Sequence, residues 1–185
     1  SDWEPVFVDF FNGETRSDRY RREVNELGEV PVLVHRGVKL TQSGVILDYL
    51  AAETGQFGWR NDAERREIMR WILFDNHKFT SYYATLRYFV GLTRTGDPAV
   101  IDFLRGRVLG AFGIVDKHLA ERDFLLGKRP TIADFSVVGY LYYQEETGVD
   151  PGKFPNLLAW RDRIAALAGW KHPYDLMPRG LAPAS

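Results

Sequence analysis

The stretch GEVPVLVHRGVKLTQSGVILDYLA, residues 28–51, decides how this chain folds. A Val-Pro pair stands at the head of a short apolar run, an Arg-Gly turn separates it from a second run, and a polar triplet then opens a helical pattern. Two short strands around a glycine turn are typical of a β-hairpin. Apolar residues three and four apart predict a helix over 43–53. We therefore expect a hairpin that leads directly into a helix.

Pro31 stands where the first of these strands would begin. Proline cannot donate a hydrogen bond to a strand ladder, so the first position of a strand explains it without any ligand. A cis Val30–Pro31 bond is the alternative, and about 5–6% of X-Pro bonds in folded proteins are cis. A cis bond would leave the Val30 backbone N–H and C=O able to pair with an extended ligand. From the residues alone, the strand start is the simpler interpretation.

The triplet Thr41, Gln42 and Ser43 lies at the start of the expected helix. Exposed backbone N–H groups and the helix dipole favour a carboxylate at such a position. Capping of the helix by Ser or Thr explains the same residues without a ligand and is commonly worth ~1 kcal/mol. Both interpretations remain open on spacing alone.

The residues before the hairpin complete a small α/β domain. Val6–Phe11 alternates and is rich in Val and Phe, which predicts a strand. Residues 14–28 have a thin apolar stripe and predict a short exposed helix that ends at Gly28. We place this domain over residues 1–58.

The rest of the chain has only helical periods and is predicted to form an all-helical domain over residues 59–185. Asp or Thr caps and first-turn prolines mark the starts of its helices. The expected helices cover residues 62–92, 98–122, 131–146 and 155–169.

A second motif, LLGKRPTIADFSVVGYL over residues 125–141, predicts a capping box. Thr131 can accept a hydrogen bond from the backbone near Asp134, and Asp134 can reach back to Thr131. Pro130 can pack on Phe135 as a hydrophobic staple. This motif is structural, and we assign it no chemistry.

Composition excludes several classes of function. The 24 basic and 25 acidic residues give a formal net charge of −1 and form no polybasic stripe, so nucleic acid is not an expected partner. The sequence has no cysteine, and its four histidines lack ligand spacing, so we expect no metal site. No apolar stretch approaches the roughly 18 residues of a membrane helix, and the start does not resemble a secretory signal. We expect a cytoplasmic protein that does not bind membranes.

The two motifs, together with FPNLLAWRDRIAALAGW over residues 154–170, resemble the cytosolic glutathione transferases. The first is similar to the glutathione-binding part of that family's thioredoxin-like domain, the second to its capping-box motif and the third to its late helix. The resemblance covers nearly the whole chain in the right order. It implies an α/β thioredoxin-like N-terminal domain, incomplete in this sequence, followed by an all-α helical-bundle domain.

The resemblance also implies where glutathione binds. Val30, with the cis-proline Pro31, would bind the cysteinyl backbone of the tripeptide. Gln42 and Ser43 would hold its γ-glutamyl end, with Ser43 and the helix N-terminus receiving the carboxylate.

The glycyl carboxylate of glutathione has a less certain partner in this sequence. Many relatives carry Lys directly before the Val-Pro pair, whereas this chain has Glu29, which would repel the carboxylate if it pointed inward. Lys39, Arg16 or His35 could substitute, although a solvated surface role is the simpler explanation for each, and Lys39 is the one we name.

The catalytic residue cannot be named from this sequence. In the family, the Tyr, Ser or Cys that activates glutathione lies in a strand and helix that precede the strand expected at Val6. Here five residues precede Val6. We expect the first strand and helix to be missing from the sequence given and leave the catalytic residue unassigned.

The second substrate is expected against the helical domain. Trp71, Phe74 and Tyr82 can share one face of the long helix, while another face builds the bundle core. The resemblance implies that such a face forms a pocket for an apolar electrophile or the interface of a homodimer.

The sequence therefore predicts a glutathione transferase that activates its co-substrate glutathione as a thiolate, attacks an apolar electrophile and serves in detoxification. One alternative is a glutathione-dependent disulfide or peroxide reductase, which a Cys at the unassigned position would favour, whereas Ser or Tyr would favour conjugation. A non-catalytic binding or scaffold protein of the same fold and a carrier of apolar ligands are the other two.

Overall fold

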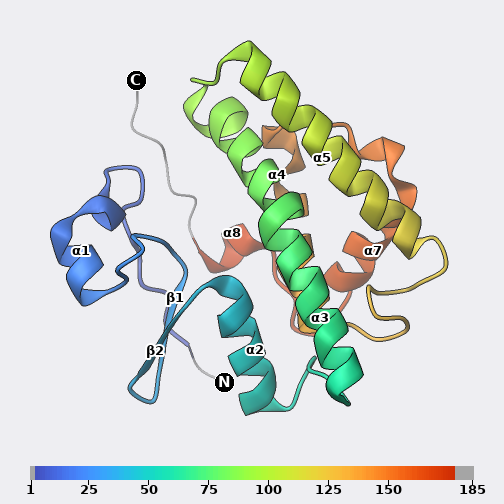
Figure 1. Cartoon of the computed structure of the whole chain (residues 1–185), viewed down its shortest axis with the longest axis horizontal. Helices are drawn as coiled ribbons and strands as arrows, with labels where there is room; N and C mark the ends of the chain where they lie inside the picture. Colours follow the sequence, from blue (N-terminus) through green and yellow to red (C-terminus); the bar gives the residue numbers. More distant parts are fainter. Residues whose placement is uncertain (1–2, 178–185) are drawn as a thin grey trace. The chain divides into compact units, whose positions relative to one another are not determined.

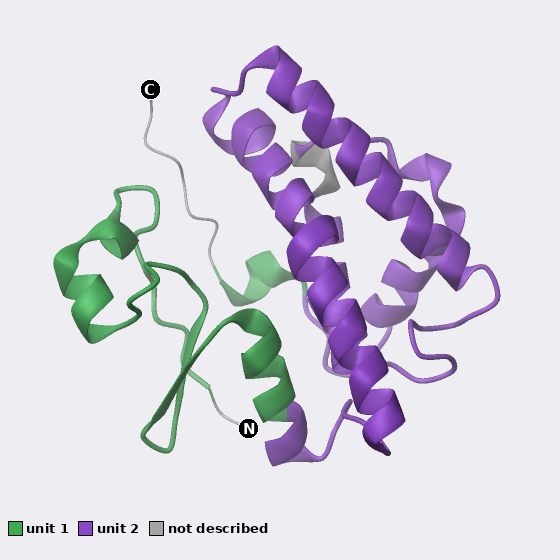
Figure 2. Cartoon of the chain, in the orientation of Figure 1, with its two compact units in different colours: residues 1–50, 172–185 green, residues 51–171 purple. Residues whose placement is uncertain are grey.

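The computed structural model describes residues 3–177, except for the side chains of residues 144–146. The chain forms two compact units, one of residues 1–50 and 172–185 and the other of residues 51–171 (Figure 2). The division falls inside the helix α2 (Ser43–Thr54). The boundary expected between residues 58 and 59 stays a prediction.

The described residues of the first unit form a hairpin, a 3₁₀ turn and three α-helical segments, of which the hairpin is seen in Figure 1. The strands β1 (Val32–His35) and β2 (Val38–Thr41) pair antiparallel, with Val32 opposite Thr41 and His35 opposite Val38. The turn residues Arg36 and Gly37 both have positive φ, of 49° and 78°, which matches the right-handed twist of the strands. The helices are α1 (Asp18–Glu23), the part of α2 up to Leu50, and α8 (Pro173–Leu176). The predicted hairpin and the helix after it are confirmed.

The strand predicted at Val6–Phe11 is wrong. Residues 6–9 have no regular structure, residues 10 and 11 lie in a turn, and Val6 is 82% exposed. An alternating pattern makes a strand only where a neighbour supplies the ladder, and within residues 3–177 the sheet consists of β1 and β2. The backbone bonds locally instead, with the Glu14 N–H donating to the Asp9 carbonyl at 3.0 Å.

The helix predicted over 14–28 is shorter than expected. It consists of a 3₁₀ turn, η1 (Glu14–Arg16), and α1, whose N-cap Ser17 accepts a hydrogen bond from the Tyr20 N–H at 3.1 Å. Gly28 does not cap α1 but lies in the following loop with φ +69°, where a Cβ atom would come within 2.8 Å of the Thr15 carbonyl. The glycine is needed because the loop approaches the backbone at Thr15 so closely.

The second unit is entirely helical, and its expected helices are confirmed with changes at their ends. One helical run is interrupted by the π-helical segment η2 and ends in a second one, η3. α4 packs against α5 and α5 against α7 (Figure 1), and α3 packs against α6. In chain order the elements are α3 (Asp62–Phe74), η2 (Asp75–Phe79), α4 (Thr80–Arg87), η3 (Tyr88–Thr93), α5 (Pro98–Leu119), α6 (Ile132–Val138), η4 (Gly139–Glu146), η5 (Pro151–Lys153) and α7 (Pro155–Ala165).

The core of this unit lies between α3, α4, α5, α6 and α7. One face of the helical run from α3 to α4 is buried in this core, and its side chains are all at most 3% exposed: Ile68, Ile72, Phe79, Tyr83 and Leu86. No described helix combines the length and the apolar composition that crossing a membrane requires.

The Asp134 carboxylate connects three parts of this core. It accepts from the Thr131 N–H at 2.8 Å and from the Thr131 hydroxyl at 3.1 Å. The first of these bonds is one half of the capping box of α6, and in the other half the Thr131 side chain accepts from the Asp134 N–H. The other carboxylate oxygen of Asp134 accepts from the Leu125 N–H at 2.8 Å and from the Trp160 indole N–H at 2.9 Å. Burial raises the pKa of Asp134, and these hydrogen bonds oppose the rise.

We predict that Asp134→Ala destabilises the protein. The change leaves buried N–H groups of Leu125, Thr131 and Trp160 without an acceptor, at ~1–3 kcal/mol each. A loss of about 3 kcal/mol or more should lower the melting temperature by roughly 6–12 °C, measured by circular dichroism. Asp102→Ala is the matched control, because that carboxylate is exposed on α5. Equal melting temperatures for the two variants would contradict the role given to Asp134.

Candidate functional site

The hairpin register brings the residues predicted to bind glutathione next to one another. Val32 is paired with Thr41 at the open end of the ladder. Pro31 directly precedes β1 and Gln42 directly follows β2 at this end. Residues 30–31 and 42–43 therefore flank the same end of the hairpin.

Two buried polar side chains hold the loop before Val30 in place. The Tyr20 hydroxyl and the Asn25 amide both donate to the Glu29 carbonyl, at 3.0 Å and 2.9 Å. Tyr20 and Asn25 are 3% and 5% exposed. Burial, together with the Glu14 carboxylate, raises the pKa of Tyr20, so its hydroxyl stays a donor. This pair fixes the main chain at the point where residues 29 and 30 enter the site.

Neither anchor was predicted for the site. Asn25 accepts from the Leu27 N–H at 3.1 Å through its side chain, and its carbonyl accepts from the Gly28 N–H at 2.9 Å. In the sequence, the spacing between Asn25 and Gly28 is typical of a turn, and this spacing could have identified Asn25. Tyr20 gives no such signal because its partner lies nine residues away.

The Val30–Pro31 peptide bond is cis, and β1 begins after it at Val32. From the residues alone, a plain strand start was the simpler interpretation of Pro31, and the cis bond was the alternative. Val30 is 45% exposed, and neither its N–H nor its C=O bonds to any described residue. The Val30 main chain can therefore still pair with an extended ligand.

Gln42 and Ser43 form the N-terminus of α2. Gln42 has φ +69°, and its carbonyl accepts from the Ile46 N–H at 3.0 Å, so it occupies the capping position with its main chain. The hydroxyls of Thr41 and Ser43 form no hydrogen bond with the described residues, which disfavours the capping interpretation of the triplet. The first turn of α2 carries no acidic residue and can receive an anion.

Glu29 lies at the same end of the hairpin. Its carboxylate accepts from the Gln42 side-chain amide at 2.8 Å, and both side chains are exposed. The acidic side chain is thus directed toward the residue predicted to hold the γ-glutamyl end of glutathione.

The candidates for the glycyl carboxylate have partners within the first unit. The Lys39 ammonium donates to the Glu23 carbonyl at the end of α1. The His35 ring nitrogen Nδ1 lies 2.8 Å from the Tyr49 hydroxyl on α2. Both contacts hold the hairpin to a helix, and the glycyl role of Lys39 stays a prediction.

The face of the long helix that carries Trp71 is not as predicted. Trp71 is 2% exposed and packs between the rings of Phe74 and His118, at centroid distances of 5.4 Å and 4.7 Å. Its placement on a free face is wrong, because the bundle covers it from a second side. Phe74 and Tyr82 are half-buried, and their role in a pocket or an interface stays a prediction.

A buried carboxylate on η2 was missed by the sequence analysis. Asp75 is 2% exposed and accepts from the Thr80 hydroxyl at 2.5 Å and from the Ser136 hydroxyl at 2.6 Å. Burial raises the pKa of Asp75 to about 6, against the effect of these hydrogen bonds. The side chain connects the π-helical segment to α6.

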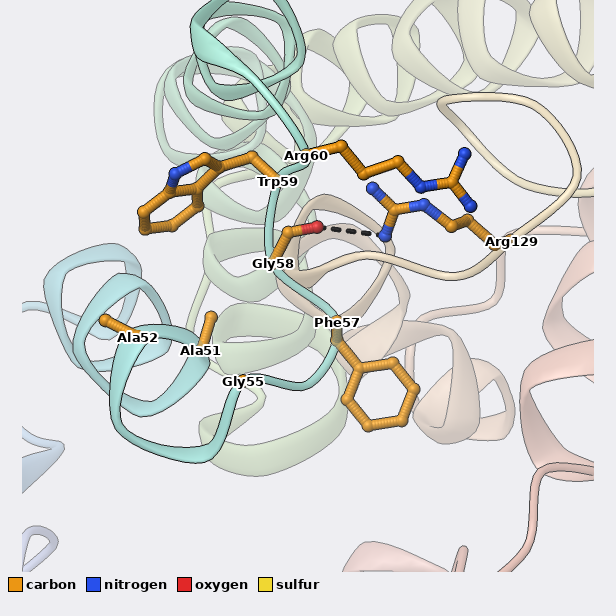
Figure 3. A pocket seen from close by; sticks show the side chains of 8 residues that line it. All are labelled: Ala51, Ala52, Gly55, Phe57, Gly58, Trp59, Arg60 and Arg129. Atoms are coloured by element: carbon orange, nitrogen blue, oxygen red, sulfur yellow. Dashed lines mark hydrogen bonds between the residues drawn. The ribbon is translucent and has the colours of Figure 1, made fainter.

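A pocket of about 410 Å³ is lined by the last turn of α2, the segment that follows it and Arg129 (Figure 3). The Arg129 guanidinium at its edge donates to the Gly58 carbonyl at 2.9 Å and to the Glu64 carboxylate at 2.5 Å. The backbone N–H of Arg60 and the Arg129 side chain together lower the pKa of Glu64. These contacts hold the segment to α3. The pocket is lined by Ala51, Ala52, Gly55, Phe57, Gly58, Trp59, Arg60 and Arg129.

Among the side chains that the structure describes, no group of three or more His, Asp or Glu residues is arranged to hold a metal ion.

Two family models match the chain. The model described as "Glutathione S-transferase, N-terminal domain" matches residues 1–52, and "Glutathione S-transferase, C-terminal domain" matches residues 79–168. The first match contains every residue predicted to bind glutathione. The second contains the capping box of α6.

Individual proteins with the same family name are similar over most of their length. Glutathione S-transferase GST-4.5 of Xanthomonas campestris is 32% identical, over 82% of this chain and 76% of its own. Glutathione S-transferase F14 of Arabidopsis thaliana is 28% identical, over 98% of this chain and 80% of its own. The crystal structure of a glutathione S-transferase from Xanthobacter autotrophicus Py2 has a TM-score of 0.79 and 31% identity, over 85% of this chain and 77% of its own.

We predict that Asp75 makes stability depend on pH. The pKa of Asp75 in the folded protein, about 6, exceeds its ordinary value of 3.8, so the folded state holds the proton more tightly than the unfolded state. The resulting contribution to the free energy of unfolding is fully present below pH 3.8 and is lost as the pH rises through 6. A shift of about two units corresponds to about 3 kcal/mol. From pH 4 to pH 7, the unfolding free energy of Asp75→Asn should therefore rise by about that amount relative to the wild type, measured by urea denaturation. A pH-independent difference, or one of opposite sign, would contradict this.

Proposed function

The chain belongs to the glutathione S-transferase family of transferase enzymes, and on that premise we propose that it binds glutathione at the open end of the hairpin. The cysteinyl main chain pairs with Val30, and the γ-glutamyl carboxylate is received at the N-terminus of α2. The proposed contacts are Val30, Pro31, Gln42 and Ser43, with Lys39 for the glycyl carboxylate.

One observation carries this proposal. The unpaired main chain of Val30 and the acid-free first turn of α2 lie at the same end of the β1–β2 hairpin. An extended peptide can add to such a main-chain segment as another strand would, while its terminal carboxylate reaches the helix N-terminus. The α-carboxylate of a γ-linked glutamyl residue lies at the end of an extended tripeptide, as this arrangement requires.

The reaction we propose is conjugation of glutathione to an apolar electrophile. The thiol loses its proton, the thiolate sulfur forms a bond to the electrophilic carbon, and the leaving group departs with its electron pair. A thiol of pKa ~8.5 is only a few per cent ionised at pH 7, and lowering the pKa by about two units takes ~2.7 kcal/mol of differential stabilisation. The residue that supplies this stabilisation is unassigned.

Detoxification of such electrophiles, a cytoplasmic location and a homodimeric state complete the proposal. The homodimer is supported by apolar side chains on α3. Met69 and Leu73 are 40% and 61% exposed and lie four residues apart, so they share one face of the helix. We propose the Met69 and Leu73 face as the dimer interface instead of the face that contains Trp71.

We predict that glutathione binds the wild-type protein and that Gln42→Ala with Ser43→Ala weakens binding at least tenfold. The double change removes the side-chain groups that would hold the γ-glutamyl end, and a hydrogen bond to a charged group contributes about 1.5–3 kcal/mol. Titration calorimetry measures both affinities. Gln56→Ala with Ser81→Ala is the matched control, because it removes the same residue types from exposed positions elsewhere. Unchanged affinity in the first variant would rule out the γ-glutamyl assignment.

We also predict a mass of about twice 21.3 kDa by size-exclusion chromatography with light scattering. Leu73→Glu should shift the protein toward the monomer, because a charge in an apolar interface has no partner. Ile114→Glu, at a position 51% exposed on α5, is the control. A monomeric wild type would remove the interface from the proposal.

A further inference from the structure

The pocket at the end of α2 has no role in the proposed function (Figure 3). Its lining residues all belong to the second unit, and none of them is a proposed glutathione contact. Its volume of about 410 Å³ falls within the roughly 300–1,000 Å³ of pockets that hold small organic ligands. A small organic molecule is therefore the kind of ligand that fits its size.

Two arginines of this pocket share one carboxylate. Figure 3 shows the guanidinium groups of Arg60 and Arg129 on the same side of the pocket. The pKa of Glu64 is lowered first by the Arg60 N–H and then by the Arg129 side chain and the charges of both guanidinium groups, so both lie near this carboxylate. Arg129 pairs with Glu64 at 2.5 Å, whereas the Arg60 guanidinium forms no hydrogen bond and no ion pair with the described residues. This side of the pocket therefore carries one positive charge more than Glu64 balances.

The free N–H donors on this side fit a phosphate better than a carboxylate. Arg129 uses two of its N–H groups, on the Gly58 carbonyl and the Glu64 carboxylate, while Arg60 keeps all of its side-chain donors. One guanidinium is enough to bind a carboxylate bidentately. A phosphate monoester has three acceptor oxygens and a charge of about −1.5 to −2 at pH 7, so it can use the donors of both arginines.

The other side of the pocket offers a flat ring and hydrogen-bond acceptors. Trp59 lines it, and the Arg65 guanidinium lies over the Trp59 ring at 4.3 Å from the centroid, which leaves the second face of the indole for another ring. Ala51 and Ala52 belong to the last turn of α2, which carries no basic side chain to pair with its terminal carbonyl groups. A nucleoside supplies both a flat ring and hydroxyl or amino donors for such carbonyls.

We propose that this pocket binds a phosphate monoester that carries a flat ring, as in a nucleoside monophosphate. The phosphate binds the guanidinium groups of Arg60 and Arg129, and the ring stacks on Trp59. Hydroxyl or amino groups of the ligand donate to the carbonyls at the end of α2. This site is additional to the proposed glutathione site, and the inference does not depend on that proposal.

The test uses adenosine 5′-monophosphate, adenosine and inorganic phosphate as probes, in titration calorimetry at pH 7 and low salt. The wild type should bind the monophosphate at least about tenfold more tightly than either part alone. Arg60→Gln should weaken its binding about tenfold or more, because a charge-assisted hydrogen bond is lost. Arg66→Gln is the matched control and should keep the wild-type affinity, since Arg66 is exposed on α3 and does not line the pocket.

A second variant tests the ring. Trp59→Leu should reduce the affinity for the monophosphate to within about threefold of that for inorganic phosphate, and it should leave phosphate binding unchanged. Thermal melting of each variant shows whether it is folded.

Each other outcome contradicts the inference. A wild type that does not bind the monophosphate, or that binds adenosine equally well, overturns it. Equal affinity in Arg60→Gln and Arg66→Gln removes the arginines from the site. Displacement of the monophosphate by glutathione in direct competition would place the ligand in the glutathione site and overturn the inference as well. A wild type that binds the monophosphate but not glutathione overturns the proposed function alone.

Discussion

The antiparallel register of β1 and β2 is the constraint on which the candidate site depends. A two-stranded sheet alone is only marginally stable in water, so the register has to be held from outside. Lys39 ties β2 to the end of α1, and His35 ties β1 to Tyr49 on α2. A slip of one residue would turn every strand side chain to the other face and separate residues 30–31 from residues 42–43. The contacts that stabilise the hairpin therefore also assemble the site.

The sequence predicted the parts of the fold that depend on residues close together in the chain. The Arg36-Gly37 turn, the start of α2 and the capping box of Thr131 and Asp134 each depend on residues a few positions apart. The four glutathione-site residues were named from the resemblance, whereas spacing alone left strand starts and helix capping as equal or better explanations. The hydrogen bonds from Leu125 and Trp160 to Asp134 could not be predicted from a local pattern, because these two residues lie outside α6.

The failures all concern features that depend on a distant partner. Val6–Phe11 has the alternation of a strand, but a ladder needs a neighbour, and the described residues supply none for it. Trp71 was given a free face because a helical pattern shows which residues share a side, not how many sides the bundle covers. No local pattern singled out Asp75. Only the π-helical turn of η2 and the packing of Ser136 against it place that carboxylate in the core.

Glu29 shows how the structure changes the meaning of a residue without changing its identity. From the sequence its charge is unfavourable, because Glu29 stands directly before the Val-Pro pair and would repel the glycyl carboxylate of glutathione if it pointed inward. The hydrogen bond from the Gln42 amide directs that charge toward the start of α2. An exposed carboxylate of this kind adds little stability to the protein itself.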